Sequence, residues 1–256
     1  MKDLFNLQGK VAIVTGGNGG IGKAIARGLA SVGADIVIAA RNEAKTAEAV
    51  GDIHGKFGTK VIGIRVDLQQ EEQIRNLAAK TVESFGRIDI LVNNAGTNIR
   101  RLPQDYEAAE WDEVLDTNLR GAFLCSQAVY QGMKTAGGGK IINIGSMTSI
   151  FGGAKLAAYG TSKGGIVQLT RSLAVAWAPD NIQVNAILPG WIDTELTRQA
   201  RKELAGLEER VINRTPIGRW GEPDELAGVA IFLASRAADF VTGVALPVDG
   251  GFSIMI

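Results

Sequence analysis

Short apolar runs rich in β-branched residues recur along the chain and alternate with longer segments in which apolar residues follow a helical period. Such runs predict buried strands, and the segments between them are long enough to be crossover helices. The predicted strands cover residues 11–15, 36–39, 61–64, 88–92, 140–144, 182–187 and 245–248. Predicted helices include residues 24–30, 71–85, 111–134, 159–177 and 223–235.

Nearly continuous apolar strands separated by helices are typical of a parallel sheet that is covered on both faces. We therefore predict an α/β fold with a single doubly wound parallel sheet of seven strands. No Pro/Gly/Ser-rich linker, repeat or low-complexity block interrupts the pattern, so residues 1–256 are predicted to form one domain. Ligands of such sheets bind beyond the carboxyl ends of the strands, and the functional residues should lie there.

Composition narrows the classes of function. The chain has 256 residues, 46% hydrophobic and 21% charged, with 27 basic and 27 acidic residues, so binding to nucleic acid or to an anionic membrane is not expected. Cys125 and His54 are the only residues of their kinds, which argues against a metal site and against Ser-His-Asp hydrolysis. The single cysteine, the lack of a signal peptide and the lack of a long apolar span lead us to expect a cytoplasmic protein.

A glycine-rich loop follows the first predicted strand, reading Thr-Gly-Gly-Asn-Gly-Gly-Ile-Gly from Thr15 to Gly22. Because glycine has no side chain, a pyrophosphate can approach the backbone N–H groups of this loop and the positive end of the following helix. A G-x-G-x-x-G pattern alone also suits a flexible turn, but a strand before it and a helix after it favour nucleotide binding.

The end of the second predicted strand bears on the choice of nucleotide. An acidic residue that would hold the ribose hydroxyls of NAD is absent there, and Arg41 and Asn42 follow the strand instead. A guanidinium forms paired hydrogen bonds with a phosphate. We therefore expect NADP(H) to be preferred, with NAD(H) possible if Arg41 is only a solvated loop residue.

Four polar residues form a candidate catalytic group. Tyr159 and Lys163 are four residues apart on one helix face, where an ammonium can lower the pKa of the phenol for acid/base work. Ser146 ends the fifth predicted strand, and Asn118 lies inside a predicted amphipathic helix, where an amide is disfavoured without a partner. Residues 93–96, Asn-Asn-Ala-Gly, end another strand at the same predicted edge.

Together these motifs resemble the short-chain dehydrogenase/reductase family, and they run from residue 15 to the C-terminal region. The resemblance implies a single NAD(P)-binding Rossmann-type catalytic domain that interconverts a secondary alcohol and a ketone by hydride transfer. Tyr159 would be the acid/base, Ser146 would hold the carbonyl oxygen, Lys163 would lower the Tyr159 pKa and grip the nicotinamide ribose, and Asn118 would hold a water. The implied cofactor-binding residues are Gly16, Asn18, Gly20, Ile21, Gly22, Arg41, Asn42, Asp67, Leu68, Asn94, Ala95, Gly96, Tyr159, Lys163, Pro189, Gly190, Ile192 and Thr194.

Alternative interpretations of single residues remain open at this point. Asp67 is placed on the adenine by the resemblance, yet it could only cap the helix that begins near Glu71. Ser146 could be a turn hydroxyl and Asn118 a structural amide. A catalytically silent nucleotide-binding regulatory protein would keep the fold, but the presence of all four catalytic residues argues against it.

The substrate is expected to lie against residues 97–103, 147–154 and the segment after Trp191, with residues 194–219 closing over it as a polar lid. Arg-Leu-Pro at 101–103, Gly-Arg-Trp-Gly at 218–221 and Val-Asp-Gly-Gly at 248–251 are similar to motifs of sugar-acid dehydrogenases. A guanidinium is a natural clamp for the carboxylate of a sugar acid. The predicted substrate residues are Arg100, Ser146, Met147, Phe151, Tyr159 and Trp191.

Other substrates stay possible on sequence alone, and a glucose-type polyol is one of them. Met147, Phe151 and Trp191 could form an apolar wall for a hydrophobic ketone or a 3-oxoacyl thioester, and Arg100 and Arg101 could be surface or subunit-contact charges. The family resemblance also implies a homotetramer built through the long helices 111–134 and 159–177.

Overall fold

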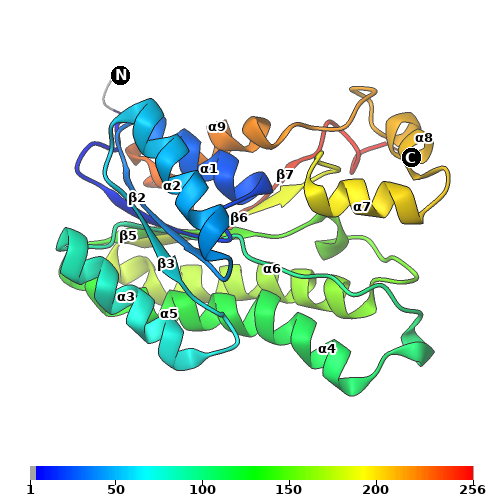
Figure 1. Cartoon of the computed structure of the whole chain (residues 1–256), viewed down its shortest axis with the longest axis horizontal. Coiled ribbons are helices and arrows are strands. Elements are labelled where there is room, and N and C mark those ends of the chain that lie inside the picture. Colours follow the sequence, from blue (N-terminus) through cyan, green and yellow to red (C-terminus); the bar gives the residue numbers. More distant parts are fainter. Residues whose placement is uncertain (1–3, 256) are drawn as a thin grey trace.

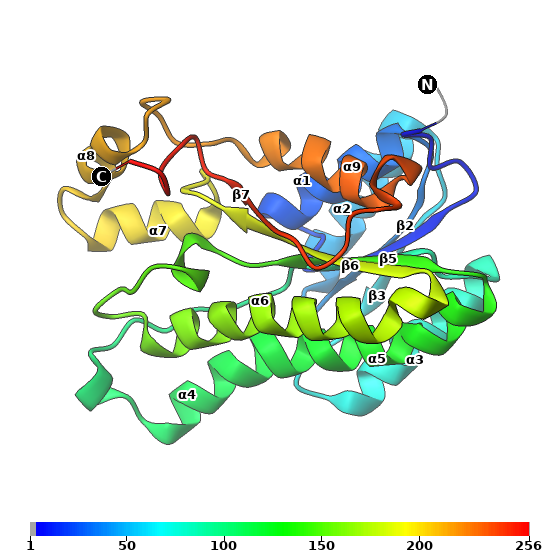
Figure 2. The same cartoon turned by 180° about the vertical axis from the view of Figure 1, so that it is seen from behind.

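The computed structural model describes residues 4–255 and contains one parallel sheet of seven strands in the order β3-β2-β1-β4-β5-β6-β7. Figures 1 and 2 show helices covering both of its faces. The predicted doubly wound fold is therefore confirmed. The strands are β1 Val11–Thr15, β2 Asp35–Ala40, β3 Val61–Arg65, β4 Ile90–Asn93, β5 Gly139–Ile144, β6 Ile182–Pro189 and β7 Ala245–Val248. The α-helices are α1 Gly20–Ser31, α2 Glu43–Phe57, α3 Glu71–Phe85, α4 Ala108–Leu115, α5 Gly121–Thr135, α6 Ala157–Trp177, α7 Glu195–Glu203, α8 Leu207–Arg214 and α9 Ala227–Ala234.

Alternation of side chains along each strand divides the core into two layers. On β1, Ala12 and Val14 pack with α1, α2 and α9, whereas Val11 and Ile13 pack with α3, α5 and α6. Successive residues of a strand point to opposite faces, so a strand buried on both faces must be apolar throughout. This is why β1 is fully buried and why the sequence pattern predicts it well.

Several predicted boundaries differ from the structure. The fourth strand begins at Ile90 and not at residue 88, because the buried Asp89 carboxylate ends the preceding turn by accepting hydrogen bonds from the Val11 N–H and from Arg87. The predicted helix 111–134 begins earlier, at Ala108, and is interrupted by a π-helical turn at Asp116–Arg120. The predicted helix 223–235 begins with a 3₁₀ turn at Pro223–Leu226 before α9. The sequence analysis missed α2 altogether.

Strand order reverses direction between β1 and β4, which are neighbours in the sheet although β2 and β3 separate them in the chain. Such a switch point opens a crevice at the carboxyl edge. The helices α7 and α8, which belong to the segment predicted as a lid, lie beyond this edge in Figures 1 and 2.

Within residues 4–255, no helix is both long and apolar enough to cross a membrane. In the same part of the chain, His, Cys, Asp and Glu side chains do not gather in threes that could hold a metal ion.

Candidate active site

A large cavity of about 2090 Å³ runs along the carboxyl edge of the sheet. Its walls come from the glycine loop, the ends of β2, β4, β5 and β6, the start of α6, and the lid helices. Almost every residue predicted from the sequence lines this one cavity. It includes Gly16, Asn18, Gly20, Ile21, Arg41, Asn42, Asp67, Leu68, Asn94, Ala95, Gly96, Arg100, Ser146, Met147, Phe151, Tyr159, Lys163, Pro189, Gly190, Trp191, Ile192 and Thr194. Gly22 and Asn118 are buried behind the wall instead.

The glycine loop is held tightly at the switch point. Gly16 and Gly20 have φ angles of +63° and +49°, a region that favours glycine. A Cβ atom on Gly22 would lie 2.4 Å from both the Gly16 carbonyl oxygen and the Asn94 Nδ2 atom. Asn94 in turn donates hydrogen bonds to the carbonyls of Thr15, at 2.9 Å, and Gly16, at 3.3 Å. Gly22 therefore shapes the loop from behind, and the Asn94 side chain joins β4 to it.

The N-terminus of α1 suits an anionic group. Gly19, its cap residue, offers no side-chain hydrogen bond, and the first turn carries no acidic residue, so the first backbone N–H groups stay available beside the cavity. A Cβ atom on Gly19 would meet nothing within 4 Å. The free N–H groups and the helix dipole fit the pyrophosphate of a dinucleotide.

Two cations follow β2, Arg41 in the loop and Lys45 in the first turn of α2. Arg41 is exposed on the cavity wall, and Lys45 lies one helical turn further on, with its Nζ 2.9 Å from Glu195 Oε2 of α7. The Asn42 side chain caps α2 by accepting from the Lys45 N–H, and Asn18 donates to the Asn42 carbonyl. The two asparagines thus shape the loop that presents Arg41.

Asp67 lies just beyond β3 and lines the cavity. Its carboxylate accepts a hydrogen bond from the Gln69 N–H at 3.1 Å, whereas the cap residue of α3 is Gln70. Asp67 is therefore not the N-cap of α3, which was the alternative left open by the sequence. Its carboxylate instead stabilises the turn that precedes this helix.

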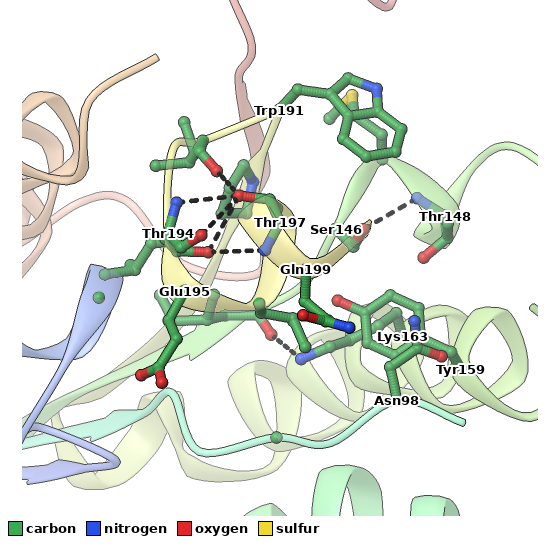
Figure 3. Close-up of a pocket in the computed structure, with 18 of the residues that line it drawn as sticks. Asn98, Ser146, Thr148, Tyr159, Lys163, Trp191, Thr194, Glu195, Thr197 and Gln199 are labelled. Carbon is green, nitrogen blue, oxygen red and sulfur yellow. Dashed lines mark hydrogen bonds between the residues drawn. The ribbon is translucent and has the colours of Figure 1, made fainter. Parts of the chain in front are cut away.

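The candidate catalytic side chains meet at the end of β5. Ser146 follows β5, and its Oγ accepts a hydrogen bond from the Thr148 N–H at 3.2 Å. Tyr159 and Lys163 are one turn apart on α6, with the Lys163 Nζ 5.7 Å from the centre of the Tyr159 ring. The Lys163 Nζ donates to the Ile144 carbonyl at 2.8 Å, as Figure 3 shows. Ser146 lies where β5 ends, and Tyr159 and Lys163 face it from one side of α6. The three side chains therefore lie at the same place in the cavity.

Burial controls the electrostatics of this group. It lowers the pKa of Lys163 to about 8, and it raises the pKa of Tyr159, a rise that the Ser146 hydroxyl and the Arg100 charge oppose. The sequence analysis expected Lys163 to lower the Tyr159 pKa. In this structure the Lys163 ammonium donates its hydrogen bond to the Ile144 carbonyl. The charge that lowers the Tyr159 pKa is that of Arg100.

Asn118 lies in the π-helical turn between α4 and α5. Its Oδ1 accepts from the Thr97 N–H at 2.8 Å, and its Nδ2 donates to the Thr97 carbonyl at 2.9 Å and to the Ser162 hydroxyl at 3.0 Å. Both N–H bonds of the amide are therefore used within the protein. The side chain ties the loop after β4 to α6, next to Lys163.

The far end of the cavity combines a cation with aromatic residues. Arg100 is largely buried there, with its Nη1 3.5 Å from Glu203 Oε2 at the end of α7. Phe151 packs edge-on against Phe252, and Trp191 packs edge-on against Trp220. The neighbouring Arg101 is exposed and pairs with Glu110 outside the cavity. Of the two adjacent arginines, only Arg100 can meet a ligand in this cavity.

A family model described as Enoyl-(Acyl carrier protein) reductase matches residues 16–253. The chain belongs to the short-chain dehydrogenase/reductase family. Two similar relatives, both 41% identical, are the 2-dehydro-3-deoxy-D-gluconate 5-dehydrogenases of Formosa agariphila, with 97% of this chain and 94% of the relative covered, and of Escherichia coli, with 97% of each. A solved gluconate 5-dehydrogenase from Burkholderia cenocepacia, in complex with NADP and tartrate, is 41% identical with a TM-score of 0.94 over 99% of both chains.

As a short-chain dehydrogenase/reductase, the protein is an oxidoreductase that uses a nicotinamide cofactor and acts on CH–OH groups. The resemblance seen in the sequence is thereby confirmed. The cavity is also lined by Asn98, Thr148 and Gln199, which lie in the segments predicted to surround the substrate. Lys45 lines it too and lies outside every predicted segment; it could have been found had the helix after Asn42 been predicted.

Proposed function

We propose that the protein is an NADP-dependent dehydrogenase that interconverts a hydroxyl and a ketone of a gluconate-type sugar acid. The observation that carries this proposal is Arg100, a largely buried cation close enough to Tyr159 to act on its pKa. A carboxylate bound to Arg100 would hold the far end of a short substrate while its reacting carbon faces the phenol. The names of the similar relatives, with about two fifths of residues identical, support the same substrate class.

The proposed chemistry uses the three side chains that meet at the end of β5, those of Ser146, Tyr159 and Lys163. A bound nicotinamide supplies or accepts the hydride at the reacting carbon. In the oxidation direction, Tyr159 takes the proton of the substrate hydroxyl, and in the reduction direction it returns that proton to the carbonyl oxygen. Ser146 donates a hydrogen bond to the same oxygen as charge develops on it. Lys163 would hold the nicotinamide ribose, as the family resemblance implies, while its ammonium donates to the Ile144 carbonyl beside Tyr159.

Asn118 acts in this proposal as a positioning residue. Its side-chain N–H bonds are committed to Thr97 and Ser162, so it holds the loop after β4 and the α6 helix at a fixed separation. The family resemblance implies that Asn118 holds a water. Because both N–H bonds of its amide are already used, Asn118 could not donate a further hydrogen bond to that water.

The preference for NADP(H) rests on Arg41 and, in addition, on Lys45. Both line the cavity where the 2′-phosphate of the adenosine would lie, and the residue that directly follows β2 is Arg41 and not a carboxylate. Arg41 favours the phosphorylated cofactor electrostatically, and Lys45 adds to this when the phosphate takes the place of Glu195 as its partner. NAD(H) can still bind through its shared pyrophosphate and nicotinamide.

We also propose a cytoplasmic homotetramer. Its support is a set of large apolar side chains exposed on helices that one sheet face does not cover, including Phe123 and Val175. Cys125, the one cysteine, is buried and unpaired, as suits a reducing compartment. The mass of the protein in solution tests the tetramer.

The deciding experiment is a cofactor-absorbance assay with NADPH and either 5-ketogluconate or the neutral ketone cyclohexanone. The sugar acid should be the better substrate. Arg100→Ala should reduce kcat/KM for the sugar acid roughly a hundredfold and kcat/KM for cyclohexanone much less, because the neutral ketone loses only the effect of Arg100 on the Tyr159 pKa. Arg101→Ala is the matched control, because Arg101 pairs with Glu110 outside the cavity. Turnover of neutral ketones only, or equal losses on both substrates in Arg100→Ala, would refute the sugar-acid proposal.

A further inference from the structure

The first residue of α7 pairs with a cation at the nucleotide end of the cavity. Glu195 Oε2 lies 2.9 Å from Nζ of Lys45, which is 150 positions away in the chain, and both residues line the cavity. The neighbouring Thr194 lies against the glycine loop, since a Cβ atom on Gly20 would be 3.4 Å from Thr194 Cγ2. Figure 3 shows Glu195 on the other side of the view from Tyr159. The ion pair therefore lies beside the proposed cofactor site and away from the reacting groups.

Glu195 is one of two acidic residues in a cavity wall that is rich in basic ones, and the other is Asp67. The Asp67 carboxylate stabilises a turn by accepting the Gln69 N–H. Among residues 4–255, the Glu195 carboxylate has no hydrogen bond or ion pair except the one with Lys45. That hydrogen bond and the Lys45 charge lower the pKa of Glu195, so the carboxylate is ionised at neutral pH. Because the Glu195 side chain is 88% exposed, it can turn into solvent without leaving a buried charge behind.

The two cations proposed to meet the 2′-phosphate differ in what they already bind. Arg41 is exposed on the cavity wall, and no acidic side chain among the described residues pairs with it. Lys45, in contrast, is held by Glu195. A phosphate can meet Arg41 directly, but it gains Lys45 only by replacing the Glu195 carboxylate.

The group on the 2′-oxygen decides whether this exchange takes place. A phosphate carries more than one negative charge and strong acceptor oxygens, so it can compete with a carboxylate for an ammonium. The 2′-hydroxyl of NAD is uncharged, and the pair of Lys45 and Glu195 can stay intact when NAD binds. Loss of the ion pair therefore offsets part of what Lys45 contributes to NADP binding, and it offsets nothing in NAD binding.

We propose that Glu195 is a specificity-determining residue that narrows the preference for NADP(H) over NAD(H) by competing with the 2′-phosphate for Lys45. The inference rests on the proposed function, which it deepens, because that proposal places the phosphate at Arg41 and Lys45. Since the ion pair joins α2 to α7, the exchange also releases the first residue of the lid helix when the phosphorylated cofactor binds.

Fluorescence titration of the cofactor-free protein tests the competition. Glu195→Gln should lower the Kd for NADPH roughly two- to fivefold, the size expected from an exposed ion pair, while the Kd for NADH changes much less. Glu48→Gln is the matched control, because Glu48 is an exposed acid of α2 that does not line the cavity. In a Lys45→Ala background, Glu195→Gln should no longer improve NADPH binding. No gain in Glu195→Gln, an equal gain for NADH, or a gain that persists without Lys45 would overturn the proposal.

Two cofactor fragments test the same exchange without nicotinamide or turnover. Adenosine 2′,5′-bisphosphate carries the 2′-phosphate and 5′-AMP lacks it, so calorimetry should show the Glu195→Gln gain for the bisphosphate alone. Arg41→Ala separates this inference from the proposed function. If Arg41→Ala weakens binding of the bisphosphate but Glu195→Gln leaves it unchanged, the NADP preference stands and the competition fails. If neither substitution alters it, the proposed place of the phosphate fails, and the competition fails with it.

Discussion

Arg100 Nη1 and Glu203 Oε2 lie 3.5 Å apart, joining the substrate end of the cavity to the last residue of α7. The other Glu203 oxygen accepts a hydrogen bond from Gln199 Nε2 at 3.0 Å, and Figure 3 shows Gln199 reaching from α7 toward Tyr159. A carboxylate of the protein therefore already pairs with the cation that is proposed to bind the substrate carboxylate. A sugar acid bound to Arg100 would compete with Glu203 for the guanidinium.

Replacing Glu203 tests this competition. In Glu203→Gln the substrate carboxylate no longer competes with a charged side chain, so KM for 5-ketogluconate should fall severalfold while KM for a neutral ketose stays unchanged. Glu208→Gln is the matched control, because it removes an acidic charge of α8 that faces Arg201 at 3.8 Å and not Arg100. Steady-state kinetics measure both. An unchanged or higher KM for the sugar acid would show that Glu203 does not occupy the carboxylate site.

Arg41 should decide the cofactor preference. In Arg41→Ala the 2′-phosphate loses a charge-assisted partner, worth about 1.5–3 kcal/mol, so kcat/KM for NADPH should fall roughly tenfold or more while that for NADH changes little. Lys45→Ala should lower NADPH use in the same direction. Arg75→Ala, an exposed arginine on α3, is the control. Comparable efficiency with both cofactors, unaffected by these substitutions, would contradict the preference.

Gly22 should tolerate no side chain. The Cβ of Gly22→Ala would lie 2.4 Å from the Gly16 carbonyl oxygen, so the loop must shift and Tm should fall by several degrees. Overpacking of this kind typically costs about 1–3 kcal/mol, and each kcal/mol moves Tm by about 2–4 °C in a chain of this size. Gly19→Ala, whose Cβ meets only open space, should keep the Tm of the unaltered chain. Thermal unfolding without cofactor distinguishes the two, and equal values would contradict the packing argument.

Lys163 gives stability a defined pH dependence. Burial lowers its pKa to about 8, while the unfolded chain keeps the proton up to about 10.5. Between these pH values the unfolded state binds more protons, so the Lys163 contribution to the free energy of unfolding rises with pH. The free energy of unfolding should therefore rise more in the unaltered chain than in Lys163→Met between pH 7 and pH 10, by on the order of 2 kcal/mol. Urea unfolding of the cofactor-free proteins measures it, and a difference independent of pH would refute the burial of a titrating ammonium.

Tyr159 should be required for chemistry and not for cofactor binding. Tyr159→Phe removes the proton donor, so kcat should fall by at least about 10²–10⁴-fold, while the Kd for NADPH stays within a factor of about three. Fluorescence titration with NADPH and the absorbance assay give the two numbers. A phenylalanine variant that retains turnover would end the assignment of Tyr159 as the acid/base.

The sequence by itself determined the sheet, the glycine loop and the family. These features are local in the chain, because a buried parallel strand must be apolar throughout, a pyrophosphate loop needs consecutive glycines, and Tyr159 and Lys163 share a face of one helix turn. Each could be seen in a window of a few residues.

The tertiary structure decided what each side chain faces. The Lys163 ammonium meets the carbonyl of Ile144, the Asn118 amide meets Thr97, and Arg100 enters the cavity while its neighbour Arg101 turns away to Glu110. Contacts between residues tens of positions apart, and the pKa values that burial sets, depend on how the strands and the lid pack and not on any local pattern.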